Sequence, residues 1–282
     1  MSPHAPSARL LALCSCLCLL ACVGAPAAAA PQAARATLFR DVRIFDGRAS
    51  ALSAPAQVLV RGRKIERISS APIAVGSDTT VVEGGGRVLM PGLIDTHWHA
   101  MYARPTAAAV MSADIGYTNL VAGAEAEATL LRGFTTVRDV GGPSFGLKRA
   151  IDEGVLPGPR IFPSGAAISQ TCGHGDFRMP YEVPRAEGAA PNRAEVLNAS
   201  VIADSPDQVR QRAREQLMLG ATQLKLMAGG GVSSAYDPLD VTQYTEAELH
   251  AAVEAAEKRK DAQLSREVEF AIPRELTKEQ GI

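Results

Sequence analysis

Two histidines, His97 and His99, are the residues whose type and spacing point most directly to chemistry. They close a short apolar segment and are separated by a single residue. Because alternate side chains of a β-strand share a face, both imidazoles are expected on one side of the strand end, with Trp98 on the other. Imidazole is a common zinc ligand, and only 5 histidines occur in the chain. The sequence therefore favours half of a metal site over a chance pair.

Lys225 is the second candidate for a metal site. It lies in an apolar segment between Leu224 and Leu226, where a charged lysine is costly to bury. A buried, partly neutral amine can take up CO2 and become a carbamate, which is an anionic oxygen donor able to bridge two cations. The alternative is a lysine at a sheet edge whose ammonium group reaches solvent. The residues alone leave both interpretations open.

Four other residues are candidates for lesser roles. His174 lies between glycines in a long loop, where it either borders a substrate pocket or is simply solvated. Tyr236 is expected to shape the pocket. For Asp139, at a predicted strand end, a structural hydrogen-bonding role is favoured over one in orienting groups near the metal. Cys172 is expected to be a small loop residue.

The elements that must position these residues fall into two parts. From residue 31 to residue 88, short alternating segments are separated by turns such as Asp46-Gly47 and Arg61-Gly-Arg63. This pattern is typical of a small antiparallel sheet or β-sandwich-like domain, and no helix fits it.

From residue 89 to residue 259, strands alternate with helices. Strands are predicted up to His99 and at residues 134–139, 160–163 and 221–227, and helices at about 117–132, 144–153, 206–219 and 245–259. The third helix is expected to begin after the cap residue Ser205 and to end at Gly220, and a capping box of Thr245 and Glu248 is expected to start the fourth. The first helix is expected to pack through one apolar face: Leu120, Val121, Ala124, Ala128 and Leu131. Serial βα units indicate a parallel sheet. About four units predict an incomplete (β/α)₈ TIM-type barrel, in which His97 and His99 take the strand-end position of functional residues.

Both ends of the chain are expected to lie outside these domains. Residues 1–30 combine Arg9, an apolar run and an alanine-rich segment, which is typical of a secretory signal, with lipid attachment at Cys22 as the alternative. Either predicts an exported protein, periplasmic or extracellular. Cys172 is then the only cysteine left, which excludes an internal disulfide framework. Residues 260–282 are charged and poorly periodic, so we expect a divergent tail produced by truncation or a frameshift.

The composition excludes two classes of partner. The formal net charge is -1 over 282 residues, so the chain has no excess of positive charge for nucleic acid or an anionic membrane. No membrane-spanning segment is expected, and the sequence leaves oligomerisation open.

Several motifs together resemble the metal-dependent amidohydrolase superfamily, and within it the imidazolonepropionase-like and Xaa-Pro or Xaa-Arg dipeptidase branch. The resemblance runs from about residue 36 to residue 259 and is carried by Pro91-Gly-Leu-Ile-Asp-Thr-His-Trp-His99, Thr135-Thr-Val-Arg-Asp-Val-Gly141, Thr171-Cys-Gly-His-Gly-Asp176 and Gln223-Leu-Lys-Leu-Met-Ala-Gly-Gly-Gly231. It implies two Zn²⁺ ions, with His97 and His99 binding the first and a carbamate on Lys225 bridging to the second. It also implies hydrolysis of an amide or peptide-like carbon–nitrogen bond in a small-molecule or dipeptide-like substrate.

The chain departs from this family pattern in its later part. The family uses histidines from the fifth and sixth strands and an aspartate from the eighth, whereas the only histidine after His174 is His250, expected on a helix surface. Two alternatives to a dipeptidase are therefore kept. One is a hydrolase of cyclic amides or imidazolones that uses the same metal site, and the other is a truncated, catalytically inactive fragment.

Overall fold

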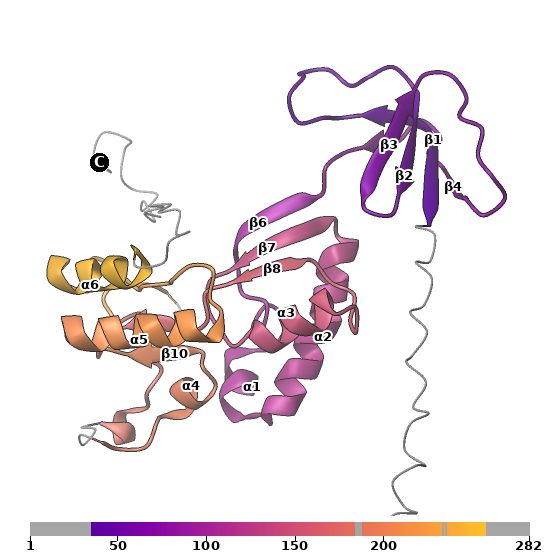
Figure 1. Ribbon diagram of the computed structural model, residues 1–282. Coiled ribbons are helices and arrows are strands. Elements are labelled where there is room, and N and C mark those ends of the chain that lie inside the picture. Colours follow the sequence, from indigo (N-terminus) through magenta and orange to yellow (C-terminus); the bar gives the residue numbers. More distant parts are fainter. Residues whose placement is uncertain (1–34, 184–187, 233, 235, 258–282) are drawn as a thin grey trace, which may run out of the picture. The chain divides into compact units, whose positions relative to one another are not determined.

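The computed structural model describes residues 35–183, 188–232, 234 and 236–257 (Figure 1). The chain divides into two compact units after Pro91, close to the boundary expected at residue 88. Among the described residues, no helix is long and apolar enough to cross a membrane. The predicted signal, with Cys22, and the predicted tail after residue 259 lie outside the described residues and stay predictions.

The first unit is built on a mixed sheet of 5 strands. Strand β1 (Ala36–Ile44) pairs in the antiparallel direction with β2 (Ala56–Arg61), and β2 pairs likewise with β3 (Lys64–Ser69). Strands β4 (Thr80–Glu83) and β5 (Val88–Leu89) both pair with β1 in the parallel direction. The core of this unit is small and is made by Ala36, Leu38, Leu59 and Ile73.

The expected antiparallel pairing is present between β1, β2 and β3, but it is wrong for β4 and β5, which pair with β1 in the parallel direction. The tight turn at Gly62, with φ of +59°, reverses the chain and produces the β2–β3 hairpin. The longer connection before β4 instead carries the chain back to the start of β1, and a strand that returns in this way runs parallel to its neighbour. The sheet order among the described residues is therefore β3–β2–β1–β4, with β5 paired to the end of β1.

The second unit contains a parallel sheet in the order β6–β7–β8. Its strands are β6 (Leu93–Trp98), β7 (Phe134–Asp139) and β8 (Arg160–Pro163), joined by α2 (Ile115–Leu131) and α3 (Phe145–Asp152) (Figure 1). Each of these elements occurs where a strand or helix was predicted. The buried side chains between sheet and helices include Ala126, Val137, Leu147 and Ile161.

The stretch between residues 164 and 204, for which no strand or helix is predicted from the sequence, contains regular structure. Strand β9 (Ala167–Ser169) follows β8 closely and pairs in parallel with β10 (Ser200–Ile202). The short helices not foreseen in the unit are α1 (Ala107–Ser112), α4 (Arg193–Val196) and a 3₁₀ turn at Pro180–Glu182. Strands of 3 residues are too short to produce a periodic hydrophobic pattern, so the sequence did not reveal them.

The predicted fourth barrel strand, residues 221–227, is not a continuous strand. The backbone of Thr222 donates to the carbonyl oxygen of Pro163 at 2.8 Å. Further along, Ile168 N donates to the oxygen of Lys225, and Met227 N donates to the oxygen of Ile168, both at 2.9 Å. The segment runs parallel to β9, with a single bridge between Ile168 and Leu226. We attribute the lack of a continuous strand at residues 221–227 to pairing on one side only. Within the described residues, β9 is the only strand that forms a β-bridge with this segment.

The packing face predicted for α2 is wrong for Leu120, Ala124 and Leu131, which are exposed, whereas Val121 and Ala128 are half-buried. Leu120 and Leu131, expected in the core, are 77% and 80% exposed. The residues that α2 does bury are small: Thr118, Ala122, Gly123, Ala126 and Thr129. The helix lies close to its neighbours, since a methyl group added at Gly158 would come within 3.2 Å of the Ala126 side chain. Only small side chains fit between elements that lie this close together, whereas the prediction placed the large apolar residues of α2 in the core.

Helices α5 (Pro206–Leu219) and α6 (Glu246–Glu257) pack against one another, as Figure 1 shows. The signals that predicted them are present in the structure. Ser205 caps α5 by accepting from Gln208 N, and Gly220 ends it with φ of +102°. Their shared core contains Val209, Ala213, Ala252 and Ala255.

The face that α2 buries in the structure predicts that one of two substitutions destabilises the protein and that the other is nearly neutral. Ala126→Leu should destabilise the protein by about 1–3 kcal/mol, because the added atoms must enter a filled space. Leu120→Ala should change the free energy of unfolding by less than about 0.5 kcal/mol, because Leu120 is exposed. Urea unfolding followed by circular dichroism measures both. If Leu120→Ala were the more damaging change, the face predicted from the sequence would be the right one.

Candidate functional site

His97 and His99 lie together at the end of β6. Their rings meet edge to face, with centroids 5.5 Å apart and planes at 65°. The i, i+2 spacing has therefore put both imidazoles on the same face, as expected. His97 is exposed, while His99 is partly buried. The two rings are close enough to share a ligand.

The surroundings of His99 keep its imidazole neutral. Burial lowers the pKa of His99, and the neighbouring His97 and the charge of Lys225 lower it further, against an opposing hydrogen bond to the Gly141 backbone. At neutral pH the ring therefore carries a lone pair, which a metal ion requires. A side chain at Gly141 would crowd this contact, because a Cβ at its position would lie 3.3 Å from Nδ1 of His99, and the φ of +156° at Gly141 is one that other residues rarely adopt.

Lys225 is half-buried, and its backbone is bonded to Ile168 of β9. Its charge acts on His99, so the structure brings the lysine within electrostatic reach of the histidine pair. Within the described ranges, no three His, Cys, Asp or Glu side chains gather into a metal cluster. The two histidines, one of them held neutral, nevertheless fit an ion that takes imidazole ligands.

Asp139 lies at the end of β7 and is fully buried. Its Oδ1 accepts from the backbone N–H of Ala100 at 2.7 Å, and its Oδ2 accepts from the hydroxyl of Ser144 at 2.5 Å. Burial raises the pKa of Asp139 to about 7, against these two hydrogen bonds. Both carboxyl oxygens are thus engaged in structural hydrogen bonds, which is the role favoured from the sequence.

His174 is bonded to a loop that the sequence did not associate with it. Its Nδ1 lies 2.9 Å from Oγ of Ser234 and 3.5 Å from Oδ2 of Asp237. Burial opposes ionisation of Asp237, but hydrogen bonds from Ser234 and from the Gly231 N–H outweigh it and lower its pKa. The ionised carboxylate accepts from Ser234, so the Ser234 oxygen is left to accept from Nδ1 of His174. His174 is therefore held by the protein and is not a solvated loop residue.

Tyr236 belongs to the same loop and is 46% exposed. Its carbonyl oxygen accepts from Sγ of Cys172 at 3.0 Å, which joins it to the loop that carries His174. That loop is also stiffened by a buried pair, in which the guanidinium of Arg178 donates to both oxygens of Asp176 at 2.7 and 2.5 Å. The structure thus places His174 and Tyr236 on two connected loops.

Sequence reasoning missed the residues that support the candidates, among them Gly141, Ser144, Gln223, Ser234 and Asp237. Gly141 and Gln223 stand inside motifs that had been singled out, so closer attention to those motifs could have found them. Ser234 and Asp237 have no such signal, because they act through a loop conformation.

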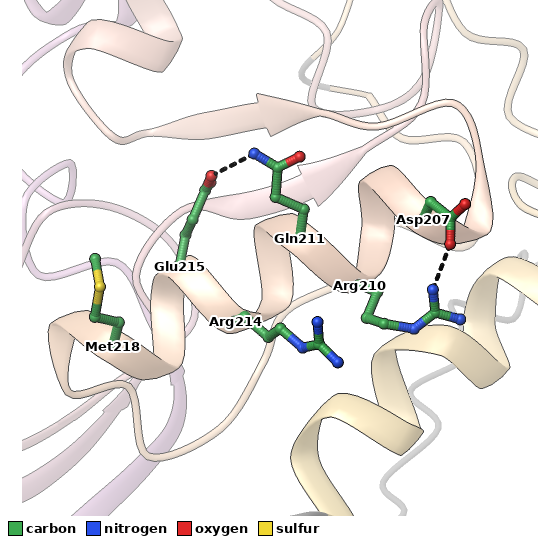
Figure 2. Close-up of a pocket in the computed structure, with 6 residues that line it drawn as sticks. All are labelled: Asp207, Arg210, Gln211, Arg214, Glu215 and Met218. Atoms are coloured by element: carbon green, nitrogen blue, oxygen red, sulfur yellow. Dashed lines mark hydrogen bonds and ion pairs between the residues drawn. The ribbon is translucent and has the colours of Figure 1, made fainter.

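A surface hollow along α5 was also considered as a site. Figure 2 shows its lining, which consists of Asp207, Arg210, Gln211, Arg214, Glu215 and Met218. All of these side chains come from one helix, and two pairs among them bond to each other, Asp207 with Arg210 and Gln211 with Glu215. The hollow includes none of the candidate residues, so we assign it no chemistry.

Comparison with known proteins identifies relatives of the chain. The model of the amidohydrolase family matches residues 88–265. Ochratoxinase from Aspergillus niger is 37% identical over 179 residues, which are 60% of this chain and 37% of ochratoxinase. The chain therefore spans well under half the length of that relative.

Solved structures of a prolidase and of a Xaa-Pro dipeptidase are also similar to this chain. A prolidase complexed with N-methylphosphonate-L-proline is 34% identical with a TM-score of 0.70, over 79% of this chain and 53% of the prolidase. A Xaa-Pro dipeptidase with methionine in its active site is 27% identical with a TM-score of 0.65, over 79% of this chain and 54% of the dipeptidase. The described α/β fold is thus that of amidohydrolases, and the chain spans about half the length of these relatives.

The raised pKa of Asp139 predicts a pH-dependent contribution to stability. Between the ordinary value of 3.8 and about 7, the folded protein holds a proton on Asp139 that the unfolded chain releases. Asp139 therefore contributes most at low pH, and its contribution is lost as pH rises through about 7. The stability of the wild type relative to Asp139→Asn should fall over this interval by roughly 4 kcal/mol. Chemical denaturation at several pH values measures it, and a difference that does not vary with pH would contradict the prediction.

Proposed function

Since this chain belongs to the amidohydrolase family, we propose that it is a metal-dependent hydrolase of carbon–nitrogen bonds of the amide or peptide-like type. The observation that carries the proposal is the contact between the His97 and His99 rings at the end of β6, with the charge of Lys225 in reach. Enzymes of this family are generally metal-dependent. In parallel α/β folds the carboxyl ends of strands are where functional groups gather.

The residues of this chain would hold the metal in two ways. His97 and His99 would hold a first Zn²⁺ ion through their imidazole nitrogens, and because the pKa of His99 is lowered, its ring would not have to lose a proton near pH 7. Lys225 would first have to lose its proton; its neutral amine would then attack CO2, forming an N–C bond and releasing one further proton, and the resulting carbamate would offer anionic oxygen ligands to a second ion. A bound ion supplies a water of lowered pKa and polarises the scissile carbonyl.

The substrate class follows from the relatives. The prolidase binds a phosphonate of L-proline, and another relative is a Xaa-Pro dipeptidase. We propose a dipeptide-like substrate, bordered by His174 and Tyr236 on their connected loops. The stiffness of the His174 loop supports this role, because a ring held by Ser234 and Asp237 needs no ordering when a substrate arrives.

The metal assignment predicts that His97→Ala lowers both bound zinc and hydrolysis. Purified wild-type protein should hold zinc by elemental mass spectrometry and cleave members of a Xaa-Pro dipeptide panel. His97→Ala should lower zinc affinity by more than about 100-fold, since loss of a ligand exceeds the 10–100-fold effect of an outer-shell change. His250→Ala is the matched control, because His250 is an exposed histidine on α6. Wild-type protein without zinc and without turnover would refute the proposed function.

The carbamate on Lys225 has a separate test. Native mass spectrometry in CO2-rich buffer should show a labile carboxyl adduct on the wild type that Lys225→Ala lacks. Lys148→Ala is the control, because Lys148 is also half-buried but lies on helix α3, where it pairs with Asp152 at 2.6 Å. Metal occupancy should fall in Lys225→Ala alone. Unchanged occupancy and an unchanged adduct would remove Lys225 from the site.

A further inference from the structure

The side chain of Gln223, two residues before Lys225, connects the lysine-bearing segment to two strand ends. Its Nε2 donates to the carbonyl oxygen of Phe162 at 2.8 Å and to that of Asp139 at 3.1 Å. Its Oε1 accepts from the hydroxyl of Thr222 at 2.5 Å. Only the amide nitrogen can donate to two carbonyls, so these partners define the orientation of the amide.

Asp139 continues this connection to the histidine pair. Its carboxylate accepts from the N–H of Ala100, the residue that follows His99 directly. Its carbonyl oxygen accepts from Gln223 and also from Ser164 N, the latter at 2.9 Å just after β8. His99 and Lys225 are therefore linked through one buried residue, Asp139, and one side chain, that of Gln223.

This link matters because the lysine-bearing segment is not a continuous strand. A regular ladder would fix its position along its whole length, whereas here it pairs with β9 by a single bridge at Leu226. The main chain of Thr222 and the side chain of Gln223 bond the preceding residues to the ends of β7 and β8. The side-chain amide of Gln223 thus supplies hydrogen bonds next to Lys225, where a regular strand would have backbone hydrogen bonds.

We propose that Gln223 is a positioning residue that, through Asp139, fixes Lys225 relative to His97 and His99. The inference rests on the proposed function, because it matters for activity only if these three residues hold metal. Gln223 touches neither substrate nor metal in this role; it sets the separation of the donors. Outer-shell residues that orient ligands typically account for a 10–100-fold change in metal affinity.

The test compares two glutamines. Gln223→Met keeps the length and most of the volume of the side chain but removes the donor. The matched control is Gln211→Met on α5 (Figure 2), where the amide bonds only to Glu215 at 3.0 Å among the interactions described. Affinities for Zn²⁺ and Co²⁺ are measured on the full chain by competition with a chromophoric chelator, with thermal unfolding measured in parallel.

Gln223→Met should bind Zn²⁺ about 10–100-fold more weakly than the wild type and change the visible absorption spectrum of bound Co²⁺. Gln211→Met should match the wild type in both. A purely structural role would lower the melting temperature and leave the Co²⁺ spectrum unchanged, which would overturn the proposal. Wild-type protein that binds neither ion refutes the proposed function, whereas equal binding by wild type and Gln223→Met refutes the positioning role alone.

A milder variant covers the case in which Gln223→Met does not fold. Thr222→Val removes the hydroxyl that lies 2.5 Å from Oε1 of Gln223 and 3.2 Å from the carbonyl oxygen of Pro163, and it leaves both hydrogen bonds donated by Gln223 possible. It should weaken Zn²⁺ binding severalfold and shift the Co²⁺ spectrum in the same direction. Binding and spectrum identical to those of the wild type would overturn the positioning role.

Discussion

The hydrogen bonds of the buried Asp139 join the strand ends on which the candidate site depends. Its carboxylate holds Ala100, and with it the end of the His97–His99 segment, while its carbonyl oxygen receives Ser164 and Gln223. Parallel pairing brings the ends of β6, β7 and β8 to one edge of the sheet. The hydrogen bonds of Asp139 hold the segments at this common edge in fixed positions relative to one another. They require a buried carboxyl group, and burial raises the pKa of that group to about 7.

Two different physical means hold the candidate residues in place. At the sheet edge, burial and neighbouring positive charge keep His99 neutral, and the absence of a side chain at Gly141 lets the backbone approach the ring. In the loops, an ionised Asp237 and Ser234 hold His174, while the Asp176–Arg178 pair stiffens the segment around it. Metal ligands need fixed geometry and a free lone pair, whereas substrate contacts need a preformed surface. The two parts of the site match these needs separately.

Much of this arrangement could be predicted from the sequence wherever local patterns determine structure. The i, i+2 spacing of His97 and His99 was enough to place both rings on one face, and the caps of α5 identified that helix. Prediction failed where contacts between residues far apart in the sequence determine the structure. Leu120 was assigned to the core because it is large and apolar, but close helix packing buried Ala122 and Ala126 instead. Three further features also depend on partners far along the chain. They are the parallel pairing of β4 with β1, the 3-residue strands β9 and β10, and the loop contacts of His174.

We propose that His97 and His99 bind one metal ion together. The most direct measurement is an anomalous difference map at the zinc absorption edge, from crystals of the protein grown with Zn²⁺. We expect a peak about 2.0–2.1 Å from a nitrogen of each ring. A zinc peak at His174 or on the protein surface, with none between His97 and His99, would contradict it.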